Sequence, residues 1–187
     1  MMGGNSLFFS HERRFRALID LLASCLELIK GHLCFYIGLS ALFGHVLAQQ
    51  AVSPASFGVG GGVFVLACGA GVLNNIQDRS YDRCFVRTCH RVMASQKVSL
   101  THAAVLSAVL IMTGLAGIWT TGGVAASGSA VLALVCYNGL YTPLKKYTLL
   151  AIFPGTVCGM LPPLIGWTSA GRNPLSMDLM LIMAVFG

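Results

Sequence analysis

The sequence predicts an all-α protein, a bundle of transmembrane helices. Of its 187 residues, 56% are hydrophobic and only 10% are charged, whereas a globular domain carries about 25% charged residues. Several windows of about 20 residues are apolar enough to cross a hydrocarbon core as helices. The long alternating strands of a membrane barrel do not occur, so helices are the expected spanning element.

The first 30 residues are predicted to form a cytoplasmic lead-in and surface helix. Glu12, Asp20 and Glu27 interrupt this segment, and the first long apolar run starts only after Lys30. A signal peptide has an uninterrupted apolar core, so this segment is a poor match to one. Residues 31–187 are predicted to form a single transmembrane domain.

Five complete spans and a truncated sixth are expected in this domain. The five cover residues 32–50, 55–76, 101–119, 123–141 and 149–168. The sixth apolar run begins near residue 177 and is too short to cross the membrane before Gly187. The sequence is therefore expected to end inside an element, as a fragment, a split gene product or a truncated chain would.

The basic residues predict the orientation of the bundle, because positive charge favours the cytoplasmic side. With the N-terminus inside, only Arg172 of the 12 basic residues falls outside. This topology brings residues 74–97 and 141–146 to one membrane face. An integral protein of a bacterial inner membrane, or its equivalent, accounts for the net charge of +6, and no nucleic-acid partner is expected.

One polar stretch, GVLNNIQDRSYDRCFVRTCHR, follows a long apolar run. Its Asn74, Asp78 and Asp82 are spaced i, i+4, i+8 and share a face of a continuous helix. Carboxylates at a helix end are the hard oxygen ligands that Mg²⁺ uses when it is shared with substrate phosphates. The pattern is consistent with a metal and diphosphate site.

Arg79, Arg83 and Arg87 form a neighbouring stripe at the same spacing, and arginines bind phosphate oxygens well. The alternative is a solvated loop whose charges pair with one another and fix the orientation of the protein. Polar groups at the membrane boundary are costly and tend to be functional, but the residues alone leave both interpretations open.

The same residues resemble the first aspartate-rich motif, N-x-x-x-D-x-x-x-D, of the UbiA superfamily of intramembrane prenyltransferases. Three further segments occur in the same order and resemble the heme O synthase branch of that superfamily. They are LELIKGHLCFYIGLSALFGHVLA (26–48), YTPLKK (141–146) and GTVCGMLPPLIGW (155–167). The resemblance covers most of residues 26–168.

The resemblance implies roles for individual residues. Asn74, Asp78 and Asp82 would bind Mg²⁺ and, through it, the diphosphate of an isoprenoid donor. Tyr141 and Lys145 match the Tyr-x-x-x-Lys of the superfamily, whose lysine helps to hold the diphosphate. The Arg83 and Arg87 positions would supply further positive charge.

The implied activity is Mg²⁺-dependent transfer of an isoprenoid from a prenyl diphosphate to an aromatic or porphyrin acceptor. Farnesyl diphosphate and heme B are the favoured pair, and membrane lipid surrounds the site. The superfamily also needs a second aspartate-rich motif, which these 187 residues lack, so they are expected to be inactive alone unless a second chain completes the bundle. The alternatives are a non-catalytic membrane subunit, a degenerate paralogue, or a small ion-coupled transporter using Asp78 and Asp82.

Overall fold

The computed structural model describes residue 19 and residues 22–186, and the regular structure in this part of the chain is entirely helical. Most of the predicted lead-in, residues 1–18, 20 and 21, lies outside the described residues, whereas residues 22–29 are helical. The elements that follow are α2 (Gly31–Gln49), α3 (Pro54–Asp82), α4 (Leu100–Leu134), the π-helix η1 (Val135–Tyr141), α5 (Thr142–Leu144), the 3₁₀ helix η2 (Leu149–Ala151), α6 (Ile152–Ser169) and α7 (Met177–Phe186). Within the described residues, four helical runs are long and apolar enough to cross a membrane.

Helix α3 carries the polar motif. It starts at a capping box between Ser53 and Ser56, with Pro54 in the first turn. A backbone N–H in the first turn has no partner within the helix, so the missing N–H of a proline costs no helical hydrogen bond there. The helix continues past the predicted span end at residue 76 as far as Asp82. The positions predicted to share a helical face therefore do lie on one helix.

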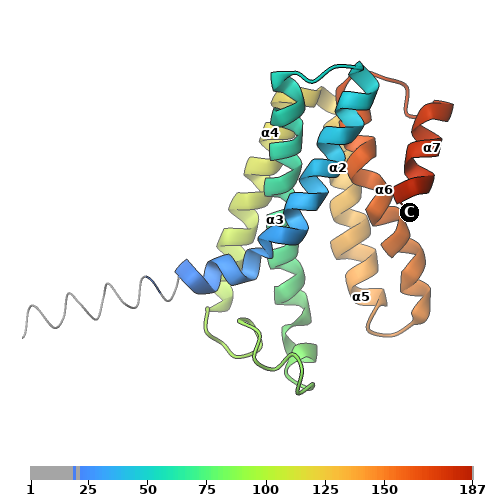
Figure 1. Ribbon diagram of the computed structural model, residues 1–187. Helices are drawn as coiled ribbons and strands as arrows, with labels where there is room; N and C mark the ends of the chain where they lie inside the picture. The colour runs from blue at the N-terminus through green and yellow to red at the C-terminus, as the bar shows by residue number, and fades with distance from the viewer. Residues whose placement is uncertain (1–18, 20–21, 187) are drawn as a thin grey trace, which may run out of the picture.

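The chain reverses its direction at Gly123, inside the long helical run Leu100–Leu144. A straight helix of that length would measure about 70 Å, more than twice the thickness of a hydrocarbon core. Gly123 has φ 67° and ψ −161°, a conformation that essentially only glycine adopts. The two predicted spans 101–119 and 123–141 are the two arms of this reversal (Figure 1).

Hydrogen bonds to α3 show that the two arms run in opposite directions. Before the reversal, Ser107 Oγ donates to the Gly69 carbonyl at 2.9 Å. After it, Asn138 Nδ2 donates to the adjacent Ala70 carbonyl at 3.0 Å. Because both arms return to the same level of α3, they form a helical hairpin packed on it.

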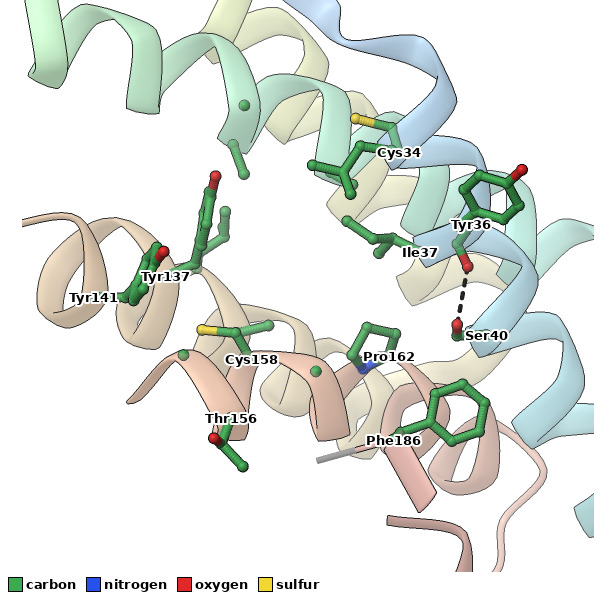
Figure 2. Close-up of a pocket in the computed structure, with 18 of the residues that line it drawn as sticks. Cys34, Tyr36, Ile37, Ser40, Tyr137, Tyr141, Thr156, Cys158, Pro162 and Phe186 are labelled. Atoms are coloured by element: carbon green, nitrogen blue, oxygen red, sulfur yellow. Dashed lines mark hydrogen bonds between the residues drawn. The ribbon is translucent and has the colours of Figure 1, made fainter. Parts of the chain in front are cut away.

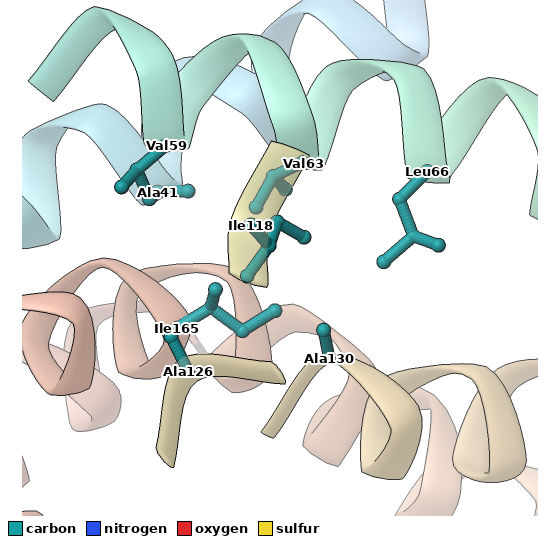
Figure 3. Packing of buried hydrophobic residues seen from close by; sticks show 8 residues of the cluster. All are labelled: Ala41, Val59, Val63, Leu66, Ile118, Ala126, Ala130 and Ile165. Carbon is teal, nitrogen blue, oxygen red and sulfur yellow. The ribbon is translucent and has the colours of Figure 1, made fainter. Parts of the chain in front are cut away.

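The central core is a cluster of alanine and branched aliphatic residues between α2, α3, both arms of α4, and α6 (Figure 3). Its members are Ala41, Val59, Val63, Leu66, Ile118, Ala126, Ala130 and Ile165. Helices α2 and α6 approach so closely that a Cβ on Gly166 would collide with the Ala41 carbonyl and the His45 amide. Such glycine contacts are typical of helices that pack in lipid, where close backbone approach drives association.

Candidate functional site

The site is built at the C-terminal end of α3, where Asp78 meets two lysines from the segment after η1. Lys145 Nζ lies 2.6 Å from Asp78 Oδ2, and Lys146 Nζ lies 3.1 Å from Asp78 Oδ1. Asp78 is separated from Lys145 by 67 positions in the sequence. These ion pairs confirm that residues 74–97 and 141–146 meet on one face of the bundle.

Asn74 lies one turn before Asp78 and orients it. Its Nδ2 donates to Asp78 Oδ2 at 2.9 Å and to Thr142 Oγ1 at 3.3 Å, and its Oδ1 accepts from Tyr137 OH at 3.4 Å. Asn74 is 4% exposed. The amide therefore links α3 to both η1 and α5 at the level of the carboxylate.

Asp82 is paired with Arg91, which comes from the loop that follows α3. Arg91 Nη1 lies 2.9 Å from Asp82 Oδ1 and 3.1 Å from Oδ2, and Thr88 Oγ1 donates to the Asp82 carbonyl at 2.9 Å. These contacts turn the chain at the helix end and bring loop residues 85–91 beside Asp82.

The predicted arginine stripe is wrong beyond this helix end. Arg83 is the C-cap of α3, keeps helical dihedral angles and so retains the spacing from Arg79, and its Nε donates to the Ala94 carbonyl at 3.0 Å. Arg87 lies on the loop and does not continue this spacing. The physical reason is that the side chain and carbonyl of Asp82 both accept hydrogen bonds from the loop, which ends the helix.

A polar network positions the two lysines. Asn138 Nδ2 in η1 donates to the Ala70 carbonyl of α3, and Gln77 Nε2 of α3 donates to the Asn138 carbonyl at 3.0 Å. Lys146 Nζ donates to the Gln77 carbonyl at 2.7 Å, and the Lys146 carbonyl accepts from Tyr81 OH at 3.3 Å. A π-helical turn is an uncommon element that is often found at functional sites, and here it leads directly into the lysine pair.

These charged groups line a pocket of about 430 Å³, which we call the charged pocket. It is lined by Asp78, Tyr81, Asp82, Phe85, Val86, Arg87, Thr88, Arg91, Lys145 and Lys146. Four cationic side chains thus surround two carboxylates. Of the predicted diphosphate-binding residues, Arg87 and Lys145 belong to this pocket.

A larger cavity of about 870 Å³, which we call the apolar cavity, lies between α2, α3, η1 and α6. Figure 2 shows Cys34 and Ile37 on one wall, Cys158 and Pro162 on another, and the rings of Tyr137 and Tyr141 at one end. The two tyrosine rings stack with centroids 5.8 Å apart.

Lys145 joins the two spaces. It lines both the charged pocket and the apolar cavity, and its Nζ sits 5.5 Å from the centroid of the Tyr141 ring, a distance at which a cation and an aromatic face attract. A ligand with a charged head and an apolar tail can therefore contact this one lysine where its two parts meet.

Sequence reasoning missed three of the cations near this junction as site residues. Lys146 and Arg91 line the charged pocket, and Lys30 lines the apolar cavity. Burial, together with the nearby charges of Arg91 and Lys145, lowers the pKa of Lys30 below its ordinary value. The available signals were the second lysine of YTPLKK, the last arginine of the RTCHR segment, and the position of Lys30 just before the first span.

The donor set suits a metal that is shared with a ligand. Within the described part of the chain, no three His, Cys, Asp or Glu residues are grouped closely enough to hold a metal alone. Mg²⁺ commonly uses one or two carboxylates and completes its octahedron with phosphate oxygens and water. Asp78 and Asp82 meet that requirement.

Several known proteins are similar to this chain. The family model described as the UbiA prenyltransferase family matches residues 37–187. The chain is 33% identical over 166 residues to the protoheme IX farnesyltransferase of Oleidesulfovibrio alaskensis, covering 89% of this chain and 59% of that protein. It is 35% identical over 161 residues to the Geobacter sulfurreducens protein of the same name, covering 86% and 59%.

A solved structure of a digeranylgeranylglyceryl phosphate synthase has the same fold. It superimposes with a TM-score of 0.76 at 23% sequence identity, over 87% of this chain and 57% of that one. The chain thus spans somewhat more than half the length of the proteins it resembles.

Proposed function

The chain belongs to the UbiA prenyltransferase family, and from that premise we propose that it binds the prenyl diphosphate donor of an isoprenoid transfer reaction. The observation that carries the proposal is that Lys145 lines both spaces. The charged pocket suits a diphosphate, and the apolar cavity suits an isoprenoid tail. A volume of about 870 Å³ lies in the range, about 300–1,000 Å³, of pockets that hold small molecules.

In this proposal the diphosphate contacts Lys145, Arg87 and the other cations of the charged pocket, and Arg83 adds positive charge from the loop. Asn74, Asp78 and Asp82 would hold Mg²⁺, which would add positive charge beside the leaving diphosphate. As the carbon–oxygen bond to the diphosphate breaks, negative charge grows on the oxygen that leaves. Cations already in place stabilise that charge without reorganisation, and this lowers the barrier.

The allylic carbon of the isoprenoid becomes positive in the same step. The stacked rings of Tyr137 and Tyr141 lie at the end of the cavity next to Lys145, and aromatic faces attract cations. The apolar walls keep water away from this carbon, so that an acceptor rather than water captures it.

We further propose farnesyl as the transferred group and heme B as the acceptor, because the relatives are named protoheme IX farnesyltransferase. The charged face would lie on the cytoplasmic side of a bacterial inner membrane, since it carries most of the basic residues. Residues 31–187 would form the membrane domain, residues 1–30 its cytoplasmic lead-in, and a further segment or second chain would provide the remaining site residues.

The test is binding of radiolabelled farnesyl diphosphate to the purified chain in detergent, with Mg²⁺ and with a chelator. The measurement is made on the 187-residue chain alone and with the C-terminal part of the Geobacter relative co-expressed. We expect Mg²⁺-dependent binding that is strengthened by the added part, followed by transfer to heme B in the complemented sample. No Mg²⁺-dependent binding in either sample would contradict the proposal and favour a non-catalytic membrane subunit.

A further inference from the structure

We propose that Lys146 and Arg91 change partners when a divalent metal binds. Their cationic groups move away from the carboxylates of Asp78 and Asp82 and contact the diphosphate, and the metal takes their place at the carboxylates. Metal and diphosphate therefore bind cooperatively. This inference rests on the proposed function, because it concerns how the same site takes up its ligands. In this role the two side chains both release the carboxylates to the metal and bind the phosphate oxygens.

The first argument is that cations already contact every carboxylate oxygen of the site. The two oxygens of Asp78 lie 2.6 and 3.1 Å from lysine nitrogens. Those of Asp82 lie 2.9 and 3.1 Å from Arg91 Nη1. A metal ion can bind any of these four oxygens only by displacing or crowding a cationic group.

The second argument is the charge of the pocket. Two carboxylates stand against four cationic side chains, Arg87, Arg91, Lys145 and Lys146, which gives the charged pocket a net charge of +2. A lone divalent ion would raise that charge further. A metal that arrives with a diphosphate brings a net negative charge, and the displaced cations gain phosphate oxygens as new partners.

The third argument is desolvation. The side chain of Asp78 is 11% exposed, and those of Lys145 and Lys146 are 26% and 16% exposed. A charge that loses its partner in such a setting leaves an uncompensated group away from water, which is strongly unfavourable. Diphosphate removes that cost because it offers acceptors at the same place.

Lys146 and Arg91 are the residues best placed to move. Lys145 also lies over the Tyr141 ring and lines the apolar cavity, which favours its present position. The backbone of Lys146 is held by the bond from Tyr81, so only its side chain has to turn, and in turning it gives up the Gln77 carbonyl as well as Asp78. The side chain of Arg91 is 42% exposed and can swing toward a ligand without opening the bundle.

The test uses Mn²⁺ as the metal and inorganic pyrophosphate as the anion. Protein-bound manganese is measured by equilibrium dialysis of the full 187-residue chain in detergent, at matched free Mn²⁺, with and without pyrophosphate. The variants are Lys146→Gln and Arg91→Gln. Lys97→Gln is the matched control, because Lys97 is an exposed cation of the same loop that does not line the charged pocket.

We expect pyrophosphate to raise the Mn²⁺ affinity of the unmodified chain and of Lys97→Gln at least tenfold. In Lys146→Gln and Arg91→Gln, the affinity for Mn²⁺ alone should rise severalfold, while the affinity in the presence of pyrophosphate should fall. These opposite changes distinguish exchange from a structural role, which would lower both affinities together.

Three outcomes would overturn the inference. Mn²⁺ binding that is equally tight without pyrophosphate would remove the coupling. A parallel loss of both affinities in the two variants would make their role structural. If pyrophosphate and Mn²⁺ fail to bind even together, the proposed function falls as well, whereas the first two outcomes leave it intact.

Discussion

Asp78 is the residue on which the candidate site depends most. It contacts both lysines and Asn74, which makes it the meeting point of α3 with the segment after η1. Asp78→Asn preserves the size of the side chain and removes its charge. We expect this variant to lose Mg²⁺-dependent binding of farnesyl diphosphate by at least a hundredfold, because it removes a metal ligand and leaves two lysines without their carboxylate. Isothermal titration calorimetry in detergent measures the loss.

The matched control for this variant is Asp178→Asn. Asp178 is an exposed acid in the first turn of α7 that lines neither the charged pocket nor the apolar cavity. Its replacement should leave binding unchanged. If Asp78→Asn binds the donor as the unmodified chain does, Asp78 does not hold the metal.

At this scale the sequence predicted neighbours along one helix but not partners across helices. The shared face of Asn74, Asp78 and Asp82 follows from helical periodicity, which is a local property. Periodicity carries no information on contacts over long separations, so the pairing of Asp78 with Lys146 was not predicted. The pair of Asp82 with Arg91 was missed for a similar reason, since it forms only because the loop folds back over the helix end.

The helical elements were predictable wherever length and hydropathy decide them. All five predicted spans appear, because about 20 apolar residues leave few alternatives in a membrane. The end of α3 was placed too early, since its last turns are polar and resemble a loop. The π-helix η1 could not be predicted from the sequence, because an apolar run looks the same in an α-helix and in a π-helix. Its position is associated with the hydrogen bond from Asn138 to the Ala70 carbonyl of α3, which is a contact between distant segments.

The helical hairpin of α4 depends on Gly123. We expect Gly123→Ala to destabilise the protein by about 1–3 kcal/mol, because an L-residue is strained at that combination of φ and ψ. The added methyl group itself would meet nothing within 4 Å, so the effect isolates backbone strain. Unfolding in mixed micelles of increasing SDS content measures the change.

The control for the hairpin variant is Gly128→Ala in the second arm of α4. Its new Cβ would also meet nothing within 4 Å, but the backbone there is helical. Alanine favours a helix over glycine by about 1 kcal/mol, so this variant should be neutral or slightly more stable. Equal stability of the two variants would show that the reversal does not require glycine.

At the crossing of α2 and α6, a glycine substitution is expected to destabilise the protein through a steric clash, whereas at Gly123 the expected cause is backbone strain. Gly166→Ala would push its methyl group into the backbone of Ala41 and His45, and backbone cannot move aside as a side chain can. We expect a destabilisation of about 1–3 kcal/mol, the usual cost of overpacking. The same unfolding assay checks it, and stability equal to that of Gly128→Ala would mean that the two helices are less close than described.

On the scale of the whole molecule, the proposed function depends on two spaces of opposite character that are both lined by Lys145. The sequence indicated the charged part, because charge is conspicuous in an apolar chain. It gave no sign of the shape of the apolar cavity, whose walls come from several segments that are far apart in the sequence. Only the arrangement of the helices brings Lys145 into the lining of both spaces, and the proposal of a single ligand with an apolar tail and a charged head depends on that.

This division predicts that tail and head binding can be separated. Cys158 lies on α6 in the wall of the apolar cavity (Figure 2), and Cys158→Phe would fill space that we assign to the isoprenoid. We expect farnesyl diphosphate to bind about tenfold more weakly, which corresponds to burying about two methylene groups fewer. Inorganic pyrophosphate, which needs only the charged pocket, should bind as before, and this retained binding shows that the variant is folded.

Leu132→Phe provides the control, because Leu132 is 49% exposed on α4 and lines neither space. It adds a phenylalanine to the outer surface of the bundle and should leave both affinities unchanged. If Cys158→Phe weakened both ligands equally, the two spaces would act as one site or the fold would be perturbed. Loss of farnesyl diphosphate binding alone would tie the cavity to the tail and the pocket to the head, with Lys145 as their junction.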